Sequence, residues 1–281
     1  MRIAYFGTPA LAVPTLRAIV EAGHDVALVV SAADKRRGRG SALQPSPVKA
    51  AALELGLAVT DRIDEVLELD PPAQLGVVVA FGRLIKPHVL ERLQFLNVHF
   101  SLLPRWRGAA PVERAILAGD EVTGVCLMAI EEGLDTGGVY RRAEVPIGPD
   151  TTADELRAEL VDVGTALVLD VLANGLGEVE PQSGEPVYAK KIDPSELQID
   201  WRRGAREVHR LVRIGNAWTT HRGRRLKVWR TSLQPSGEGI VVATGSGPIE
   251  VLEVQPEGKP RMPARAWANG VHWKPGDRLG T

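Results

Sequence analysis

The sequence has little cysteine and no long apolar run, and each shortage excludes a class of protein. Its single cysteine, Cys126, can form neither an intramolecular disulfide nor a zinc site built from several cysteines. The most continuous apolar stretch, 75–81, is far shorter than the roughly 20 residues of a membrane-spanning helix. The amino terminus is typical of a short strand ended by a turn and not of a signal peptide. We therefore expect a cytoplasmic protein without a membrane segment.

Net charge is almost absent as well, but the charges are unevenly distributed. The 34 Lys and Arg residues against 35 Asp and Glu residues leave a formal net charge of −1. Residues 1–183 contain 17 basic and 25 acidic residues (net −8), whereas 184–281 contain 17 and 10 (net +7). The window 202–230 alone holds ten cations and one anion, Glu207. The small total thus hides a basic carboxy-terminal region, which is typical of a phosphate-binding surface.

The hydrophobic pattern of the first 180 residues alternates between short apolar runs and helical periodicity. Strands are predicted near 2–6, 26–31, 76–81, 95–100 and 123–130, and helices near 11–22, 46–56, 86–93 and 110–119. Apolar residues spaced from Leu156 to Val171 predict a further amphipathic helix. This alternation is typical of a doubly wound, mostly parallel α/β sheet.

The carboxy-terminal third has a different pattern of apolar, basic and turn-forming residues. Residues 174–186 are rich in Gly, Glu and Pro and indicate the approach to a linker. Beyond it, one basic helix near 204–213 and short segments at 225–233, 238–244 and 248–255 predict a small β-barrel or sandwich. We expect a catalytic domain at 1–183, a linker at 184–202 and a second domain at 203–281.

The turn after the first strand is one candidate ligand site. Its Phe6–Pro9 segment lacks the second and third glycines with which a dinucleotide-binding turn approaches a pyrophosphate. A nicotinamide cofactor is therefore not favoured. The alternative is that Gly7 and Pro9 only shape a tight turn and start a helix.

A stronger candidate site follows the strand near 95–100. Asn97 and His99 are two residues apart and project to one face, where an amide could hold an oxyanion and an imidazole could carry a proton. Asp135 lies between glycines after the strand near 123–130, where it could orient that imidazole. The alternatives are that Asn97 and His99 are hydrogen-bonded structural side chains, and that Asp135 bonds its own turn.

The segments around these residues resemble a known family. Asn97–Pro104 followed by Gly133–Gly137 is similar to the signature of the folate-dependent formyltransferases. Further segments resemble, more narrowly, the members that act on charged initiator tRNA: 6–9, 38–40, 43–49, 78–82, 104–111, 199–201 and 254–259. The resemblance covers nearly the whole chain.

The resemblance implies a Rossmann-like catalytic domain, an OB-like second domain and direct formyl transfer from 10-formyltetrahydrofolate without a metal. The methionyl α-amine of the charged tRNA would attack the formyl carbon, with Asn97, His99 and Asp135 as the catalytic residues. The folate donor would be bound by residues of three segments: Phe81, Gly82, Arg83, Leu84, Ile85, Ser101, Leu102, Leu103, Pro104, Gly133 and Leu134.

The resemblance and the basic region together indicate which residues bind the tRNA. A loop with arginine at position 39 would engage the acceptor end, and the carboxy-terminal cations would hold phosphates. The expected contacts are Arg36, Arg37, Arg39, Lys49, Arg203, Arg206, Arg210, Arg213, Arg222, Arg224 and Arg225. We expect the protein to act as a monomer.

Two alternatives stay open at this point. One is another enzyme that uses formyl-folate, either a small-molecule formyltransferase or a formyl-folate hydrolase. The other is an RNA-binding protein whose α/β domain has lost catalysis. The basic carboxy-terminal region disfavours the first, and the presence of Asn97, His99 and Asp135 disfavours the second.

Overall fold

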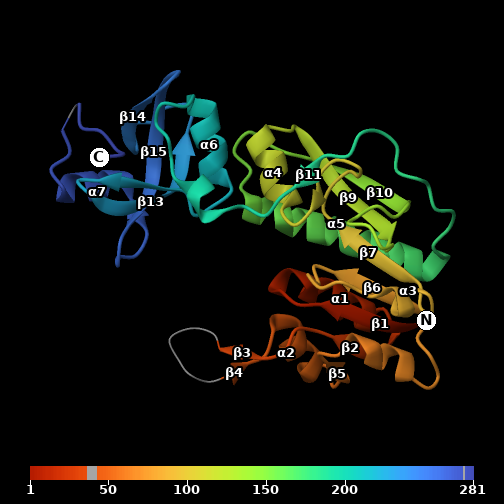
Figure 1. Cartoon of the computed structure of the whole chain (residues 1–281). Coiled ribbons are helices and arrows are strands. Elements are labelled where there is room, and N and C mark those ends of the chain that lie inside the picture. Colours follow the sequence, from red (N-terminus) through yellow and green to blue (C-terminus); the bar gives the residue numbers. More distant parts are fainter. Residues whose placement is uncertain (37–42, 275) are drawn as a thin grey trace. The chain divides into compact units, whose positions relative to one another are not determined.

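The computed structural model describes residues 1–36, 43–274 and 276–281 and divides into two compact units (Figure 1). The first unit comprises Met1–Pro111, Val122–Pro146 and Arg157–Ala189. The second comprises Val112–Glu121, Ile147–Leu156 and Lys190–Thr281. Two short pieces from earlier in the chain, 112–121 and 147–156, therefore belong to the carboxy-terminal unit. The division into domains at 183 and 203 stays a prediction.

The first unit is built on a seven-stranded sheet in the order β10-β9-β7-β6-β1-β2-β5. Six of these strands run in the same direction, and only β9 runs antiparallel, to its neighbours β7 and β10. The predicted mostly parallel α/β sheet is thereby confirmed. The strands span Arg2–Gly7 (β1), Asp25–Val30 (β2), Val59–Thr60 (β5), Leu75–Val79 (β6), Phe95–His99 (β7), Val122–Ala129 (β9) and Val139–Pro146 (β10).

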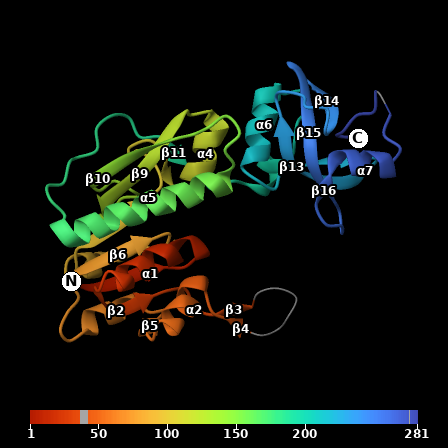
Figure 2. The ribbon, with the colours of Figure 1, turned by 180° about the vertical axis from the view of Figure 1, so that it is seen from behind.

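Helices cover the sheet on both faces. A 3-10 helix at Ala10–Ala12 follows directly after Pro9. Figure 2 shows the longest helix, α5, lying over β9 and β10, and a side chain at Gly164 of this helix would meet Val98 and Val125. Within the described residues, no helix is long and apolar enough to cross a membrane. The helices are Val13–Glu21 (α1), Pro47–Glu54 (α2), Pro87–Leu90 (α3), Pro111–Ala118 (α4) and Ala153–Asn174 (α5), with a further 3-10 helix at Ile63–Glu68.

Three phenylalanines anchor one face of the sheet. Phe6 at the end of β1 packs edge-on against Phe81 and Phe95, with ring centroids 5.4 Å and 5.3 Å away. All three rings are buried in one apolar cluster. Because such edge-to-face pairs stabilise packing beyond their buried area, they fix the ends of β1 and β6 against the start of β7.

Two pairs of short strands complete the first unit and its loops. β3 (Lys35–Arg36) pairs with β4 (Leu43–Gln44), on either side of the stretch that the structure does not describe. β8 (Arg107–Gly108) pairs in parallel with β11 (Tyr188–Ala189). The second pair ties the segment after β7 to the segment after α5.

The second unit is a small β domain, as predicted. Its sheet has the order β12-β13-β15-β14, with β16 paired to β15. The apolar faces of α6, β13, β15 and α7 form its core. The elements are the 3-10 helix Pro194–Leu197, α6 (Ala205–Arg213), β12 (Trp218–His221), β13 (Arg224–Ser232), β14 (Ile240–Thr244), β15 (Gly247–Pro256), β16 (Met262–Pro263) and α7 (Ala264–Gly270).

Helix α6 binds the piece 147–156 within the second unit. Buried Arg213 donates from Nε to the Thr151 carbonyl at 2.8 Å and from a terminal nitrogen to the Gly148 carbonyl at 2.8 Å. His209 contacts the Pro149 carbonyl and the Thr231 hydroxyl, and its burial lowers the pKa of the imidazole. These polar contacts connect the start of α5 to the carboxy-terminal β domain.

We predict that Arg213→Ala lowers the free energy of unfolding by about 1–3 kcal/mol, because it leaves two main-chain acceptors without their charged donor. Urea denaturation followed by circular dichroism measures this change. Arg206→Ala on the same helix is the matched control, since its side chain is exposed. Equal stability of the two variants would contradict the structural role of Arg213.

Candidate active site

The site begins at the carboxyl end of β7. Asn97 and His99 project from the same face of this strand, and His99 is only 6% exposed. His99 lies opposite Cys126 of β9, and Asn97 lies opposite Met128. Among the described residues, no hydrogen bond holds the Asn97 carboxamide, so its N–H groups are free to meet a ligand.

The segment after β7 turns back and holds the imidazole by its main chain. The Trp106 carbonyl lies 2.9 Å from Nε2 of His99. Trp106 has φ +65°, a left-handed conformation that is uncommon for a bulky residue and occurs where surrounding contacts fix it. Because a carbonyl can only accept, this contact places the proton of the neutral imidazole on Nε2.

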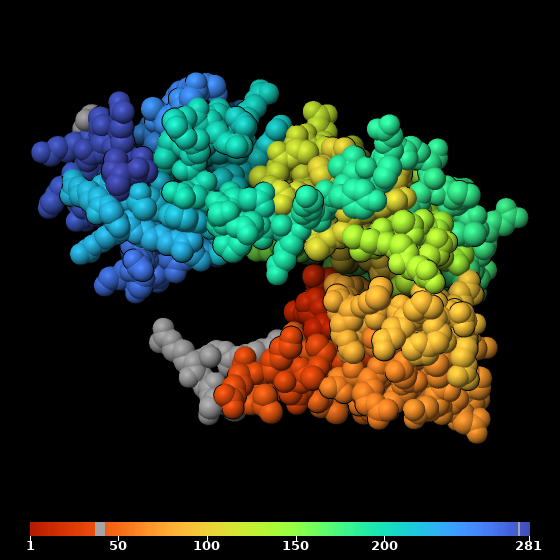
Figure 3. Space-filling view, in the orientation of Figure 1, coloured from red at the N-terminus to blue at the C-terminus, as the bar shows by residue number. Residues whose placement is uncertain are grey.

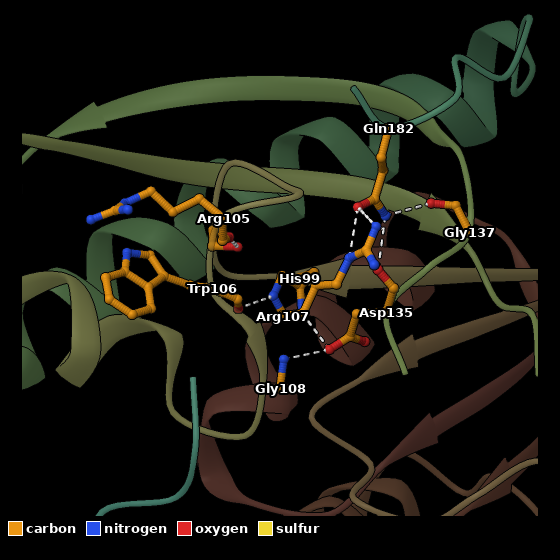
Figure 4. A network of polar contacts seen from close by, with 9 residues as sticks. His99, Arg105, Trp106, Arg107, Gly108, Asp135, Gly137 and Gln182 are labelled. Atoms are coloured by element: carbon orange, nitrogen blue, oxygen red, sulfur yellow. Dashed lines mark hydrogen bonds and ion pairs between the residues drawn. The ribbon is translucent and has the colours of Figure 1, made fainter. Parts of the chain in front are cut away.

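Asp135 faces the other ring nitrogen. Its Oδ2 lies 3.6 Å from Nδ1 of His99 and accepts a hydrogen bond of 2.7 Å from the Gly108 amide (Figure 4). The 3.6 Å gap is longer than a hydrogen bond, so Nδ1 keeps the capacity to exchange a proton with a substrate. The side chains of His99 and Asp135 are only 7% and 17% exposed, which strengthens the attraction between the carboxylate and a protonated imidazole.

The close approach of the main chain at Gly108 explains why glycine stands there. Gly108 has φ +118°, and a Cβ at this position would lie 2.9 Å from the Ala189 carbonyl oxygen. A side chain would therefore push β8 away from β11 and move the amide that binds Asp135. Trp106 and Gly108 act through main-chain groups, which residue types do not reveal.

The segments predicted to bind folate contain both buried and exposed residues. Phe81, Ile85, Ser101 and Leu103 are buried. The remaining predicted contacts are Gly82, Arg83, Leu84, Leu102, Pro104, Gly133 and Leu134, of which Leu84 and Leu134 are exposed at 73% and 63%. Exposed apolar side chains beside main-chain polar groups suit a flat heteroaromatic ligand.

The predicted tRNA contacts differ in their exposure and in their contacts within the protein. In the first unit Arg36 is exposed, Lys49 forms a 2.7 Å ion pair with Asp34, and Arg37 and Arg39 lie outside the described residues. In the second unit Arg210 lies against Gly119 and the Ala118 carbonyl, and Arg213 is buried. The exposed members are Arg203, Arg206, Arg222, Arg224 and Arg225.

Two tryptophans beside these arginines were not predicted as functional. Arg225 stacks over Trp218 at 4.3 Å, and Arg261 stacks over Trp229 at 3.4 Å from the ring centroid. Lys227 also approaches Trp229, at 5.3 Å. The alternation of Arg225, Lys227 and Trp229 along one strand is the sequence signal that could have identified this face. In Figure 3 the region coloured cyan to light blue, which includes 203–230, forms part of the visible surface of the unit.

The described residues form no cluster of metal-binding side chains. No group of three or more His, Cys, Asp and Glu side chains is placed there to hold an ion. The expectation that the reaction needs no metal stays a prediction.

Comparison with known proteins gives matches along most of the chain. The formyl transferase family model matches residues 1–172, and the model of the formyl transferase carboxy-terminal domain matches 191–272. The methionyl-tRNA formyltransferase of Symbiobacterium thermophilum is 44% identical over 310 aligned residues, covering 99% of this chain and 95% of the relative.

Solved structures share the fold at low sequence identity. The methionyl-tRNA formyltransferase from Clostridium thermocellum has a TM-score of 0.61 at 15% identity, with 90% of this chain and 99% of that chain covered. HypX from Aquifex aeolicus in complex with tetrahydrofolic acid has a TM-score of 0.68 at 19% identity. This chain is covered to 99% in that match but spans only 48% of HypX.

We predict that the neutral imidazole of His99 carries its proton on Nε2 and that Nδ1 is unprotonated. Nitrogen-15 NMR of histidine-labelled protein distinguishes the two tautomers, and the His99→Asn variant identifies the signals. A protonated Nδ1 in the neutral ring would contradict the contact with the Trp106 carbonyl.

Proposed function

Because this chain belongs to the formyl transferase family, we propose that it transfers the formyl group of 10-formyltetrahydrofolate to the α-amino group of methionyl initiator tRNA. The product serves translation initiation. The observation that carries the proposal is the buried His99–Asp135 pair beside the free Asn97 carboxamide, in a chain 44% identical to a methionyl-tRNA formyltransferase over nearly its full length.

Asn97, His99 and Asp135 have different roles in the formyl transfer. The amine nitrogen bonds to the formyl carbon while the carbon–N10 bond of the donor breaks, and the donor supplies the activated formyl group. Asn97 donates an N–H to the negative charge that develops on the formyl oxygen, a role often worth about 10²–10³ in rate. His99 delivers a proton to the departing nitrogen from Nδ1, because Nε2 is occupied by the Trp106 carbonyl.

Asp135 completes the proton balance. Its carboxylate faces Nδ1 at 3.6 Å and stabilises the imidazole in its protonated form. The proton that the attacking amine loses passes to this pair, directly or through water, and replaces the one delivered to N10. The Gly108 amide keeps the carboxylate in place throughout.

The segments 81–85, 101–104 and 133–134 bind the folate donor in this proposal. Gly82 and Ala80 both have positive φ, at +71° and +47°, so the main chain after β6 turns sharply there. The exposed Leu84 and Leu134 supply apolar contact, and main-chain groups supply hydrogen bonds.

The tRNA is held by phosphate contacts in the second unit. We place these contacts at the exposed arginines of the segment 203–206 and of the β12–β13 hairpin, together with the Trp218 and Trp229 face. Arg210 and Arg213 are left out, because neither is exposed and both contact main-chain carbonyls of the protein. In the first unit Arg36, Arg37, Arg39 and Lys49 are proposed to meet the acceptor end. A cytoplasmic location and a monomeric state belong to the same proposal.

A small-molecule formyltransferase and a formyl-folate hydrolase would use the same three catalytic residues. The +7 charge of 184–281 and its exposed arginines favour a polyanionic substrate over a small one. The direct test is incubation of the protein with 10-formyltetrahydrofolate and charged initiator tRNA, with uncharged and elongator tRNAs as controls. Formylation of a free amino compound in preference to the charged tRNA would overturn the assignment.

We predict that His99→Ala and Asp135→Ala each lower kcat/KM for formylation by about 10²–10⁴, because both variants lose proton transfer at Nδ1. Binding of tRNA, measured by filter retention, should stay within about threefold of the unmodified protein. His88→Ala is the matched control, since His88 also pairs with an aspartate, Asp64, but on an exposed surface. Near-normal turnover in either site variant would remove the proposed mechanism.

A second prediction concerns the basic surface. Replacing Arg206 and Arg224 together by Glu should weaken tRNA binding and reduce the salt dependence of the association constant by about one unit of slope per lost phosphate contact. Folate binding should not change. Arg92→Glu provides the control, as an exposed arginine of the first unit with the same change of charge. An unaltered salt slope in the double variant would exclude these arginines from the interface.

A further inference from the structure

Gln182 lies in the Gly- and Pro-rich segment between α5 and β11 but contacts the active-site loop. Its Nε2 donates to the Asp135 carbonyl at 2.8 Å and to the Gly137 carbonyl at 2.7 Å. The sequence pattern of 174–186 indicated only the approach to a linker. Figure 4 shows its carboxamide directed at the loop that carries Asp135.

The oxygen of the same carboxamide is hydrogen-bonded as well. Its Oε1 accepts from Nε of Arg107 at 3.0 Å and from a terminal nitrogen of Arg107 at 2.6 Å. Because a guanidinium can only donate and a carbonyl can only accept, the orientation of the amide is determined. Both N–H groups and the oxygen of Gln182 are therefore engaged, and its side chain can adopt one position.

The partners of Gln182 belong to the two segments that form the His99–Asp135 site. Arg107 stands between Trp106, whose carbonyl contacts His99, and Gly108, whose amide contacts Asp135. Asp135 and Gly137 belong to the loop between β9 and β10. Gln182 thus joins the segment that holds the imidazole to the loop that supplies the carboxylate.

The loop needs such a connection because its own backbone is unusual. Asp135 has φ +50°, and Gly137 packs so closely that a Cβ would lie 2.0 Å from the Ala129 carbonyl. The two carbonyls bound by Gln182 flank Thr136, directly after the carboxylate-bearing residue. Losing both hydrogen bonds would let the Asp135 main chain rotate and alter its distance from His99.

We propose that Gln182 is a positioning residue that fixes the separation of Asp135 from His99, an inference that rests on the proposed function of this pair. Its hydrogen bonds run to Arg107, Asp135 and Gly137, so it acts through the main chain of the loop. The competing possibility is a purely structural tie between the segment 175–187 and the rest of the unit.

The variant Gln182→Glu separates these two possibilities. It keeps the size of the side chain and an acceptor for Arg107, but it directs a carboxylate oxygen at the carbonyls of Asp135 and Gly137. We expect kcat to fall by about 10- to 100-fold, as for other displacements of a catalytic group by about 1 Å, while KM for each substrate stays within about threefold. The neighbouring variant Ser183→Ala changes an exposed side chain and should keep the unmodified kcat.

A double-variant cycle tests whether Gln182 acts through Asp135. In the Asp135→Ala background, Gln182→Ala should cause no further loss of kcat, because the carboxylate that it positions is already gone. Losses that multiply, or a normal kcat for Gln182→Glu, would overturn the proposal. Thermal unfolding of each variant confirms that the fold persists.

A measurement without substrate keeps this inference distinct from the proposed function. Nitrogen-15 NMR signals of His99 should change in Gln182→Ala, which adds no charge, and stay unchanged in Ser183→Ala. If the unmodified protein formylates no tRNA but the His99 signals change as expected, the proposed function fails and the positioning role stands. Unchanged His99 signals in Gln182→Ala contradict the positioning role.

Discussion

The contact between the Trp106 carbonyl and Nε2 of His99 is the constraint on which the site depends. It occupies one ring nitrogen and leaves the other facing Asp135. Two residues later the Gly108 amide binds the same carboxylate, so a single short segment of main chain sets both members of the pair. The pairing of β8 with β11 holds this segment in place within the first unit. Main-chain groups are rigidly placed by the fold, which suits a geometry that must be fixed before substrates bind.

In the proposed function the second unit holds a large polyanion, and some of its basic residues are occupied by contacts within the protein. Arg210 and Arg213 lie on α6 among other basic residues, yet they bind carbonyls of 112–121 and 147–156. Arg203 and Arg206, on the same basic segment, stay exposed. A count of charges therefore overstates the surface that is available to phosphates, because burial assigns part of the basic helix to structure.

Elements with continuous apolar residues could be predicted from the sequence, and elements with mixed residues could not. β1, β6, β7 and β9 each contain a run of buried residues and lie close to the predicted ranges. β10 carries Arg141, Arg142 and Glu144 at the edge of the sheet, so its periodicity gave no signal.

In the site, Asn97, His99 and Asp135 were predicted from residue type and resemblance. Trp106, Gly108 and Gln182 act through main-chain groups or long-range contacts, which a sequence does not display. Ala129 lies opposite Leu96, so the loop after β9 must return along β7 to bring Asp135 to His99.

A crystal structure of the protein with a non-transferable analogue of the formyl-folate donor tests directly whether Asn97 and His99 meet the formyl group. We predict that the formyl oxygen lies within hydrogen-bond distance of the Asn97 carboxamide nitrogen, and that N10 lies within reach of Nδ1 of His99. The bond from Nε2 to the Trp106 carbonyl should persist in that complex. A donor whose formyl group contacts neither side chain, or whose N10 faces Nε2 in place of Nδ1, would contradict this prediction.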